Sequence, residues 1–78
     1  ARLNGVVLQD AVASEMIFSI PEIIAYLSTF TTLLPGDVIA TGTPGGVGAK
    51  RTPPVWMKAG DSIEIEVAGV GVLRNPIV

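Results

Sequence analysis

The side chains that could carry acid–base chemistry are few in this chain. It contains no histidine and no cysteine, and its acidic residues number seven. Most of these have a structural explanation: one caps a predicted helix, two follow glycine in turns, and two alternate along a predicted strand. In that order they are Glu22, Asp37, Asp61, Glu64 and Glu66. Asp10 and Glu15 stay unassigned. Without histidine, cysteine or a carboxylate cluster, hydrolysis or proton abstraction lacks its agents here, so we assign no catalytic residue.

Glu64 and Glu66 are the one pair that could hold a divalent cation. Two residues apart on a strand, they point to the same face. Asp61, three residues before Glu64, is already explained by its turn, and no other carboxylate lies nearby in the sequence. We therefore favour a solvent-exposed strand face over a metal site, and we assign no metal ligand in this chain.

The loop at residues 41–48 (TGTPGGVG) is the best candidate for ligand binding. It is no Walker loop, because Lys50 is preceded by alanine and followed by arginine, and no dinucleotide fingerprint fits either. It does combine two hydroxyls with glycine-rich backbone, whose N–H groups can form a concave site for an anion such as a carboxylate. The alternative is a turn-rich corner in which the threonines cap the backbone locally.

The elements that would position this loop can be predicted from local patterns. Asn4–Gly5 favours a hairpin turn, followed by a strand from Val6 to about Ala11. Ser19 begins a helix, because residues 19–22 (SIPE) have the spacing of a capping box. Apolar residues then recur at helical spacing as far as Leu34, so we expect one amphipathic helix that ends at the following proline and glycine.

Two similar turns follow, at residues 34–37 (LPGD) and 58–61 (KAGD). Each is expected to begin a strand, the first a buried one at residues 38–40 and the second at residues 62–67. In the second, Ile63, Ile65 and Val67 alternate with polar residues and are predicted to point inward. A last strand is expected from Val70 to Leu73.

Composition limits the class of protein. Hydrophobic residues make up 49% of the 78 residues and charged residues 15%, against about 25% charged in average soluble proteins. The excess fits either a tightly packed small β protein or a chain buried against absent chain or another subunit; we favour the second. The net charge is −2, and Lys50–Arg51 is the only adjacent basic pair, which argues against nucleic acid. The apolar stretch at residues 16–34 carries polar residues on one helical face, so we expect no membrane span.

Three segments together resemble the C-terminal part of the fumarylacetoacetate hydrolase family. They are residues 4–9 (NGVVLQ), 16–24 (MIFSIPEII) and 34–48 (LPGDVIATGTPGGVG). The turn at Gly60–Asp61 and the closing residues 69–71 with Asn75 fit the same pattern. The resemblance covers essentially the whole chain.

This resemblance implies a mostly β fold with one helix (α+β), part of a mixed β-sandwich or roll. Residues 1–78 would be the C-terminal segment of a single catalytic domain whose N-terminal part is missing, inactive alone. The family acts on 2-oxo or enolisable dicarboxylic acids by C–C bond hydrolysis, decarboxylation, isomerisation or hydration. It uses Mg²⁺, Mn²⁺ or Ca²⁺, with ligands that would lie outside this chain.

The resemblance also implies a site. Thr43 would meet the substrate carboxylate, while Gly42 and Thr41 would shape the loop. It further implies a cytoplasmic homodimer, active in the catabolism of aromatic compounds, whose partners are a small 2-oxo acid and the rest of the same domain. The residues 49–57 are longer than in the simplest members and have no assigned role. The competing hypothesis is a small non-catalytic β module that binds a protein partner through its apolar face.

Overall fold

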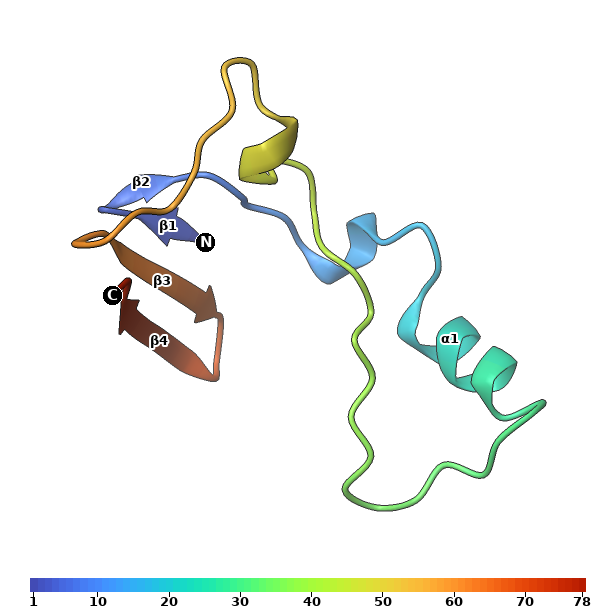
Figure 1. Cartoon of the computed structure of the whole chain (residues 1–78). Coiled ribbons are helices and arrows are strands. Elements are labelled where there is room, and N and C mark those ends of the chain that lie inside the picture. The colour runs from blue at the N-terminus through green and yellow to red at the C-terminus, as the bar shows by residue number, and fades with distance from the viewer. The chain divides into compact units, whose positions relative to one another are not determined.

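The computed structural model describes residues 1–78, which form two compact units. The first unit contains residues 1–10 and 44–78, and the second contains residues 11–43. The first holds a β-sheet and the second holds the α-helix, as the mostly β prediction with one helix requires (Figure 1).

The first unit is built on a four-stranded antiparallel sheet with the order β2-β1-β3-β4. Its strands are β1 (Arg2–Leu3), β2 (Val6–Val7), β3 (Ser62–Val67) and β4 (Gly71–Pro76). The sheet therefore joins the first residues of the chain to the last, as Figure 1 shows in blue and red. Leu3, which lies opposite Ile63, is 9% exposed and is the only buried apolar side chain.

The predicted hairpin turn between β1 and β2 is confirmed. Asn4 and Gly5 have φ of 51° and 82°, the positive values that a two-residue type I′ turn needs. The strand after it is shorter than expected, ending at Val7 instead of about Ala11. Strand β1 offers only two residues to pair with β2. The residue after β2, Leu8, donates its N–H to the Ala1 carbonyl at 2.9 Å.

The Asn4 side chain links this hairpin to the second glycine–aspartate turn. Its Nδ2 donates to Asp61 Oδ1 at 2.9 Å, and its Oδ1 accepts the Ser62 N–H at 2.9 Å. Asp61 Oδ2 also accepts the Lys58 N–H at 2.9 Å. These bonds, the Asn4 bond first, hold the pKa of the Asp61 carboxyl below its usual value. Asp61 is also the one buried polar residue, with 7% of its surface exposed.

The β3–β4 hairpin confirms the second predicted strand and extends the last one. Strand β4 runs to Pro76, not to Leu73, because proline at its end lies opposite Ser62 on an edge strand, where its missing N–H is tolerated. The apolar residues predicted to point inward are less covered than expected: Ile65 is 45% and Val67 54% exposed. The face that they form has no covering layer within the sheet unit.

The helical unit contains a short 3₁₀ helix, η1 (Ala13–Glu15), and α1 (Ile20–Leu27). The predicted capping box at the start of α1 is confirmed. Ser19 Oγ accepts the Glu22 N–H at 3.3 Å, and Glu22 Oε2 accepts the Ser19 N–H at 2.7 Å. The Ser19 backbone N–H, and after it the Ser19 hydroxyl, favour the ionised carboxylate and so lower the pKa of Glu22.

Helix α1 ends at Leu27, earlier than the predicted end near Leu34. Two hydroxyls directly after it bond to helix carbonyls: Ser28 Oγ to Ile24 at 2.7 Å and Thr29 Oγ1 to Tyr26 at 2.6 Å. Serine and threonine compete in this way with helical bonding. The apolar periodicity continues past the point where the polar residues end the helix.

The strand predicted at residues 38–40 is wrong. The segment after the turn at residues 34–37 forms no strand, and Val38 is 93% exposed instead of buried. A strand needs a neighbour for its backbone groups, and no segment of this chain pairs with residues 38–40.

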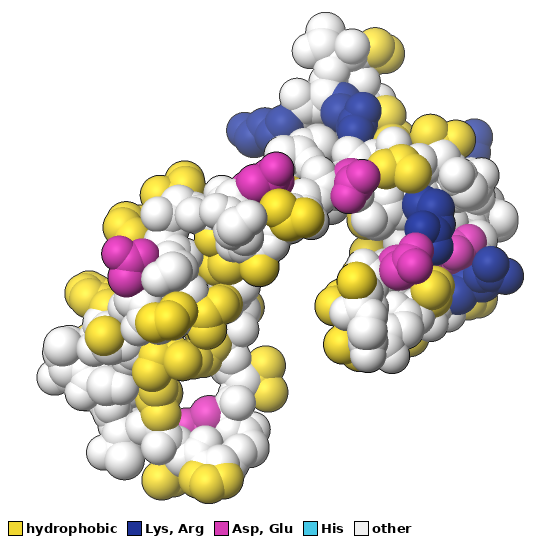
Figure 2. Space-filling view, turned by 180° about the vertical axis from the view of Figure 1, so that it is seen from behind, with side chains coloured by type: hydrophobic (Ala, Val, Ile, Leu, Met, Phe, Trp, Pro, Cys, Tyr) yellow, Lys and Arg dark blue, Asp and Glu magenta, His cyan; other side chains and the backbone are white.

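Figure 2 shows apolar side chains, in yellow, over much of the helical unit, whereas charges of opposite sign lie side by side on the sheet unit.

Candidate functional site

The predicted substrate-binding residues are consecutive and exposed. Thr41, Gly42 and Thr43 lie at the end of the helical unit, outside any helix or strand. Gly42 has φ of 109°, and a Cβ there would meet no atom within 4 Å. The left-handed backbone, and not lack of space, is therefore what requires glycine at this position.

The second half of the loop, Pro44 to Gly48, belongs to the sheet unit and is held there by side chains from elsewhere in that unit. Gln9 Nε2 donates to the Pro44 carbonyl at 2.8 Å. The Arg51 guanidinium donates from Nε to the Gly46 carbonyl at 3.0 Å and from Nη2 to the Leu8 carbonyl. The loop is thus fastened at its second half by two side chains that the sequence did not reveal as site residues.

Two glycines allow close approach of backbone in this part of the loop. Gly46 has φ of 103°, and a Cβ there would overlap the Leu8 carbonyl oxygen. A Cβ at Gly48 would overlap the Val55 carbonyl oxygen, and the Val55 N–H donates to the Gly48 carbonyl at 3.0 Å. The segment from Gly48 to Val55 begins with a 3₁₀ turn, η2 (Gly48–Lys50). Residues 48–55 therefore close on themselves directly after the loop.

The Glu64 and Glu66 pair is occupied by arginine. Arg2 contacts Glu64 Oε2 at 3.1 Å and Glu66 Oε2 at 2.6 Å, and Arg74 contacts Glu64 Oε1 at 3.1 Å. Ion pairing, with the Arg2 hydrogen bond first, lowers the pKa of Glu64, and the pKa of Arg2 is raised. The Glu64 side chain is 15% exposed, less than the predicted solvated face. Two guanidinium groups neutralise this pair.

The acidic side chains of this chain do not fit a divalent-metal centre. Nowhere do three of them gather at metal-binding distance, and a hard cation needs several convergent oxygen ligands. The pair that faces one way on β3 already binds arginine.

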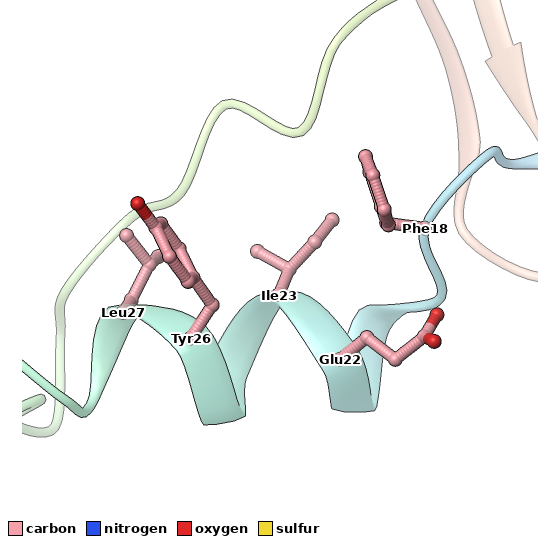
Figure 3. A pocket seen from close by; sticks show the side chains of 5 residues that line it. All are labelled: Phe18, Glu22, Ile23, Tyr26 and Leu27. Atoms are coloured by element: carbon pink, nitrogen blue, oxygen red, sulfur yellow. The ribbon is translucent and has the colours of Figure 1, made fainter.

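One face of α1 carries a shallow apolar hollow. It is lined by Phe18, Glu22, Ile23, Tyr26 and Leu27. In Figure 3 Ile23, Tyr26 and Leu27 rise from one side of the helix, and Phe18 rises from the segment before it. The Glu22 carboxylate turns toward the helix start, where it caps the backbone. The hollow therefore offers mainly apolar contact, and its one carboxylate serves as a helix cap.

Comparison with known proteins supplies the family. The family model described as fumarylacetoacetate (FAA) hydrolase C-terminal matches residues 1–78. The chain belongs to this family. The resemblance inferred from the loop and turn motifs is confirmed, and so is the mostly β fold with one helix.

Individual relatives agree. Oxaloacetate tautomerase YisK of Bacillus subtilis (strain 168) is 53% identical over 97% of this chain and 25% of its own length. Mitochondrial oxaloacetate tautomerase FAHD2A of Bos taurus is 47% identical over 99% of this chain and 24% of its own length. Fumarylacetoacetate hydrolase (EaFAH) from psychrophilic Exiguobacterium antarcticum has a TM-score of 0.93 and 41% identity, covering 97% of this chain and 27% of that chain.

The chain spans about a quarter of the length of the curated relatives that it matches. These relatives are enzymes of the family, which places this chain in an enzyme family. As for membranes, none of its helices has the length and apolar character needed to cross one.

Proposed function

We propose that this chain is the C-terminal segment of an enzyme that interconverts the keto and enol forms of oxaloacetate or a similar 2-oxo dicarboxylic acid. The observation that carries the proposal is the naming of relatives from distant organisms as oxaloacetate tautomerases, at 47% and 53% identity over nearly all of this chain. The loop at residues 41–43 has the chemistry to bind one carboxylate of such a substrate.

The contribution of this segment is binding and orientation. The hydroxyl of Thr43 donates to a substrate carboxylate, and the backbone of Gly42, with its positive φ, presents that hydroxyl from an exposed segment. Holding one carboxylate orients the carbonyl group and the neighbouring CH₂. In tautomerisation the CH₂ carbon loses a proton and the carbonyl oxygen gains one. The group that accepts this proton lies outside residues 1–78, as does any set of metal ligands. The proposed cofactor is a divalent ion, Mg²⁺, Mn²⁺ or Ca²⁺, which would supply a Lewis acid when bound.

The rest of the catalytic domain is the proposed cover for the apolar surface. On the helical unit Ile17 is 92%, Phe18 65% and Tyr26 69% exposed. Large apolar patches of this kind mark surfaces that other chain covers. Relatives four times as long offer that chain within one protein, which supports this proposal over a free-standing module with a separate protein partner. A homodimer is proposed with it.

A second activity, C–C bond hydrolysis, has support from the relative of Exiguobacterium antarcticum, whose title names a fumarylacetoacetate hydrolase. Assays of the full-length enzyme with oxaloacetate and with fumarylacetoacetate separate the two. Decarboxylation and hydration stay predictions, as does a role in aromatic catabolism. Cytoplasmic location also stays a prediction, because several relatives are named as mitochondrial.

The experiment compares two threonines of the same loop in the full-length enzyme. Thr43→Val keeps the shape and removes the hydroxyl. A charge-assisted hydrogen bond is worth about 1.5–3 kcal/mol, so kcat/KM for oxaloacetate should fall roughly 10- to 150-fold. The rate is followed by the ultraviolet absorbance of the enol.

Thr41→Val is the matched control, since it removes the same group two residues away. It should affect folding more than turnover, because a hydroxyl at the start of the loop is expected to bond the backbone. Normal turnover of Thr43→Val would contradict the substrate role. Equal losses of stability in both variants, with normal specific activity, would support the turn-rich corner instead.

A further inference from the structure

Arg51 joins two backbone segments that are far apart in the sequence. Its Nε and Nη2 donate to the carbonyls of Gly46 and Leu8. The residue is half-buried, and no carboxylate forms an ion pair with it. A guanidinium group this close to backbone acts as a fork between two carbonyl acceptors, a geometry that a single ammonium does not reproduce.

The joined segments also touch directly. Gly46 lies so close to the Leu8 carbonyl that a Cβ would overlap it. Gln9, the next residue, donates to the Pro44 carbonyl at 2.8 Å. Three contacts thus hold residues 44–46 against the segment that follows β2. Pro44, the first of these residues, is covalently bonded to Thr43.

Resting on the proposed function, we propose that Arg51 is a positioning residue of the substrate loop. By bridging Leu8 and Gly46 it fixes the backbone that follows Thr43, and so it limits the positions that the Thr43 hydroxyl can adopt. This gives a role to residues 49–57: the segment closes on itself at Gly48 and Val55 and delivers the guanidinium to the loop.

The experiment uses the full-length enzyme with three single variants. Arg51→Met removes the fork and the charge, and kcat/KM for oxaloacetate should fall about 10- to 100-fold, the effect of a small misplacement of a binding group. Arg51→Lys keeps the charge but not the fork, and it should fall nearly as far. Lys50→Met is the matched control: it removes the same charge from the adjacent residue, and its kcat/KM should stay within about twofold.

Amide hydrogen exchange provides a measurement that does not depend on activity. In Arg51→Met, exchange should increase at the amides of Lys50 and Val55, which donate to the Val47 and Gly48 carbonyls of the loop. It should stay unchanged at β3 and β4, because the loop loses an anchor while the sheet keeps its bonds. Unchanged exchange at Lys50 and Val55 would overturn the proposal. So would an increase throughout the sheet, since Arg51 would then be a general stabiliser.

A double-mutant cycle tests whether Arg51 acts through Thr43. If it does, adding Arg51→Met to Thr43→Val should lower kcat/KM only slightly further, because the affected contact is already absent. Full additivity would overturn the route through Thr43. If Thr43→Val alone left turnover normal, the substrate role of Thr43 would fail, while hydrogen exchange would still decide whether Arg51 holds the loop.

Discussion

The turns at residues 34–37 and 58–61 share their local hydrogen bonds and yet lead to different structures. In each, the aspartate carboxylate accepts the N–H of the first turn residue, at 2.7 Å in the first and 2.9 Å in the second. The glycines have nearly equal φ, 93° at Gly36 and 92° at Gly60. The second turn is followed by β3, whereas the segment after the first stays without a strand.

The difference lies in what surrounds each turn. The second turn bonds to the residues that directly follow β1 and β4, the two neighbours of β3. Asn4 binds the Asp61 carboxylate, and the Gly60 N–H donates to the Ile77 carbonyl at 2.9 Å. The first turn has no such bonds to distant residues. Local sequence is therefore enough to form the turn, but the strand after it forms only where other chain supplies hydrogen-bond partners.

Alanine at the two glycines tests whether the turns are locally equivalent. Neither position would bring a Cβ within 4 Å of another atom, so only the positive φ opposes the substitution. We expect Gly36→Ala and Gly60→Ala in the full-length enzyme to lower the free energy of unfolding by the same amount, roughly 1–2 kcal/mol. Urea unfolding measures this. A much larger loss of unfolding free energy in Gly60→Ala would show that the second turn cannot be altered without also destabilising the sheet.

Removing the Asn4 side chain should affect only the second turn. Asn4→Gly keeps the positive φ, so any loss reports on the side chain. The bond to the Ser62 N–H is expected to contribute about 0.5–1.5 kcal/mol to the free energy of unfolding. Urea unfolding should show this loss, and hydrogen exchange should increase at the start of β3 but not at residues 34–37. An unchanged urea midpoint would contradict the role given to Asn4.

The pH dependence of the second turn should be the smallest effect, since it is absent at neutral pH. The folded-state pKa of Asp61 is lowered from the usual 3.8. Its contribution to stability is therefore fully present above that value and is lost as the pH falls through the lower folded pKa. Urea midpoints measured from pH 6 to pH 2, about the range in which carboxylates titrate, should decrease less steeply in Asn4→Gly than in the parent. Identical slopes would count against the Asn4 bond as the main cause.

Features that depend on neighbouring residues were predictable from the sequence. The Asn4–Gly5 turn, the capping box at Ser19 and Glu22, and both glycine–aspartate turns each require residues no more than three positions apart. The glycine-rich loop was found in the same way, because its composition is local. Its substrate role came from the family resemblance and stays a prediction.

Features that depend on distant residues were missed. Arg2 neutralises Glu64, 62 positions later, and Arg51 bonds to Leu8, 43 positions earlier. No local pattern indicates either contact. The wrong strand at residues 38–40 has the same origin, since its apolar sequence suits a strand but its partner is not supplied by this chain.

The pairing of β1 with β3 has a consequence for synthesis of the protein. Leu3 lies opposite Ile63, so about 60 residues must leave the ribosome after β1 before its partner exists. At 5–20 residues per second this takes roughly 3–12 s. During that interval the β1–β2 hairpin, with two residues in each strand, has an unpaired edge and few bonds of its own. Nascent chains of this protein should therefore depend on other protein surfaces, such as those of chaperones, to shield that edge until β3 arrives.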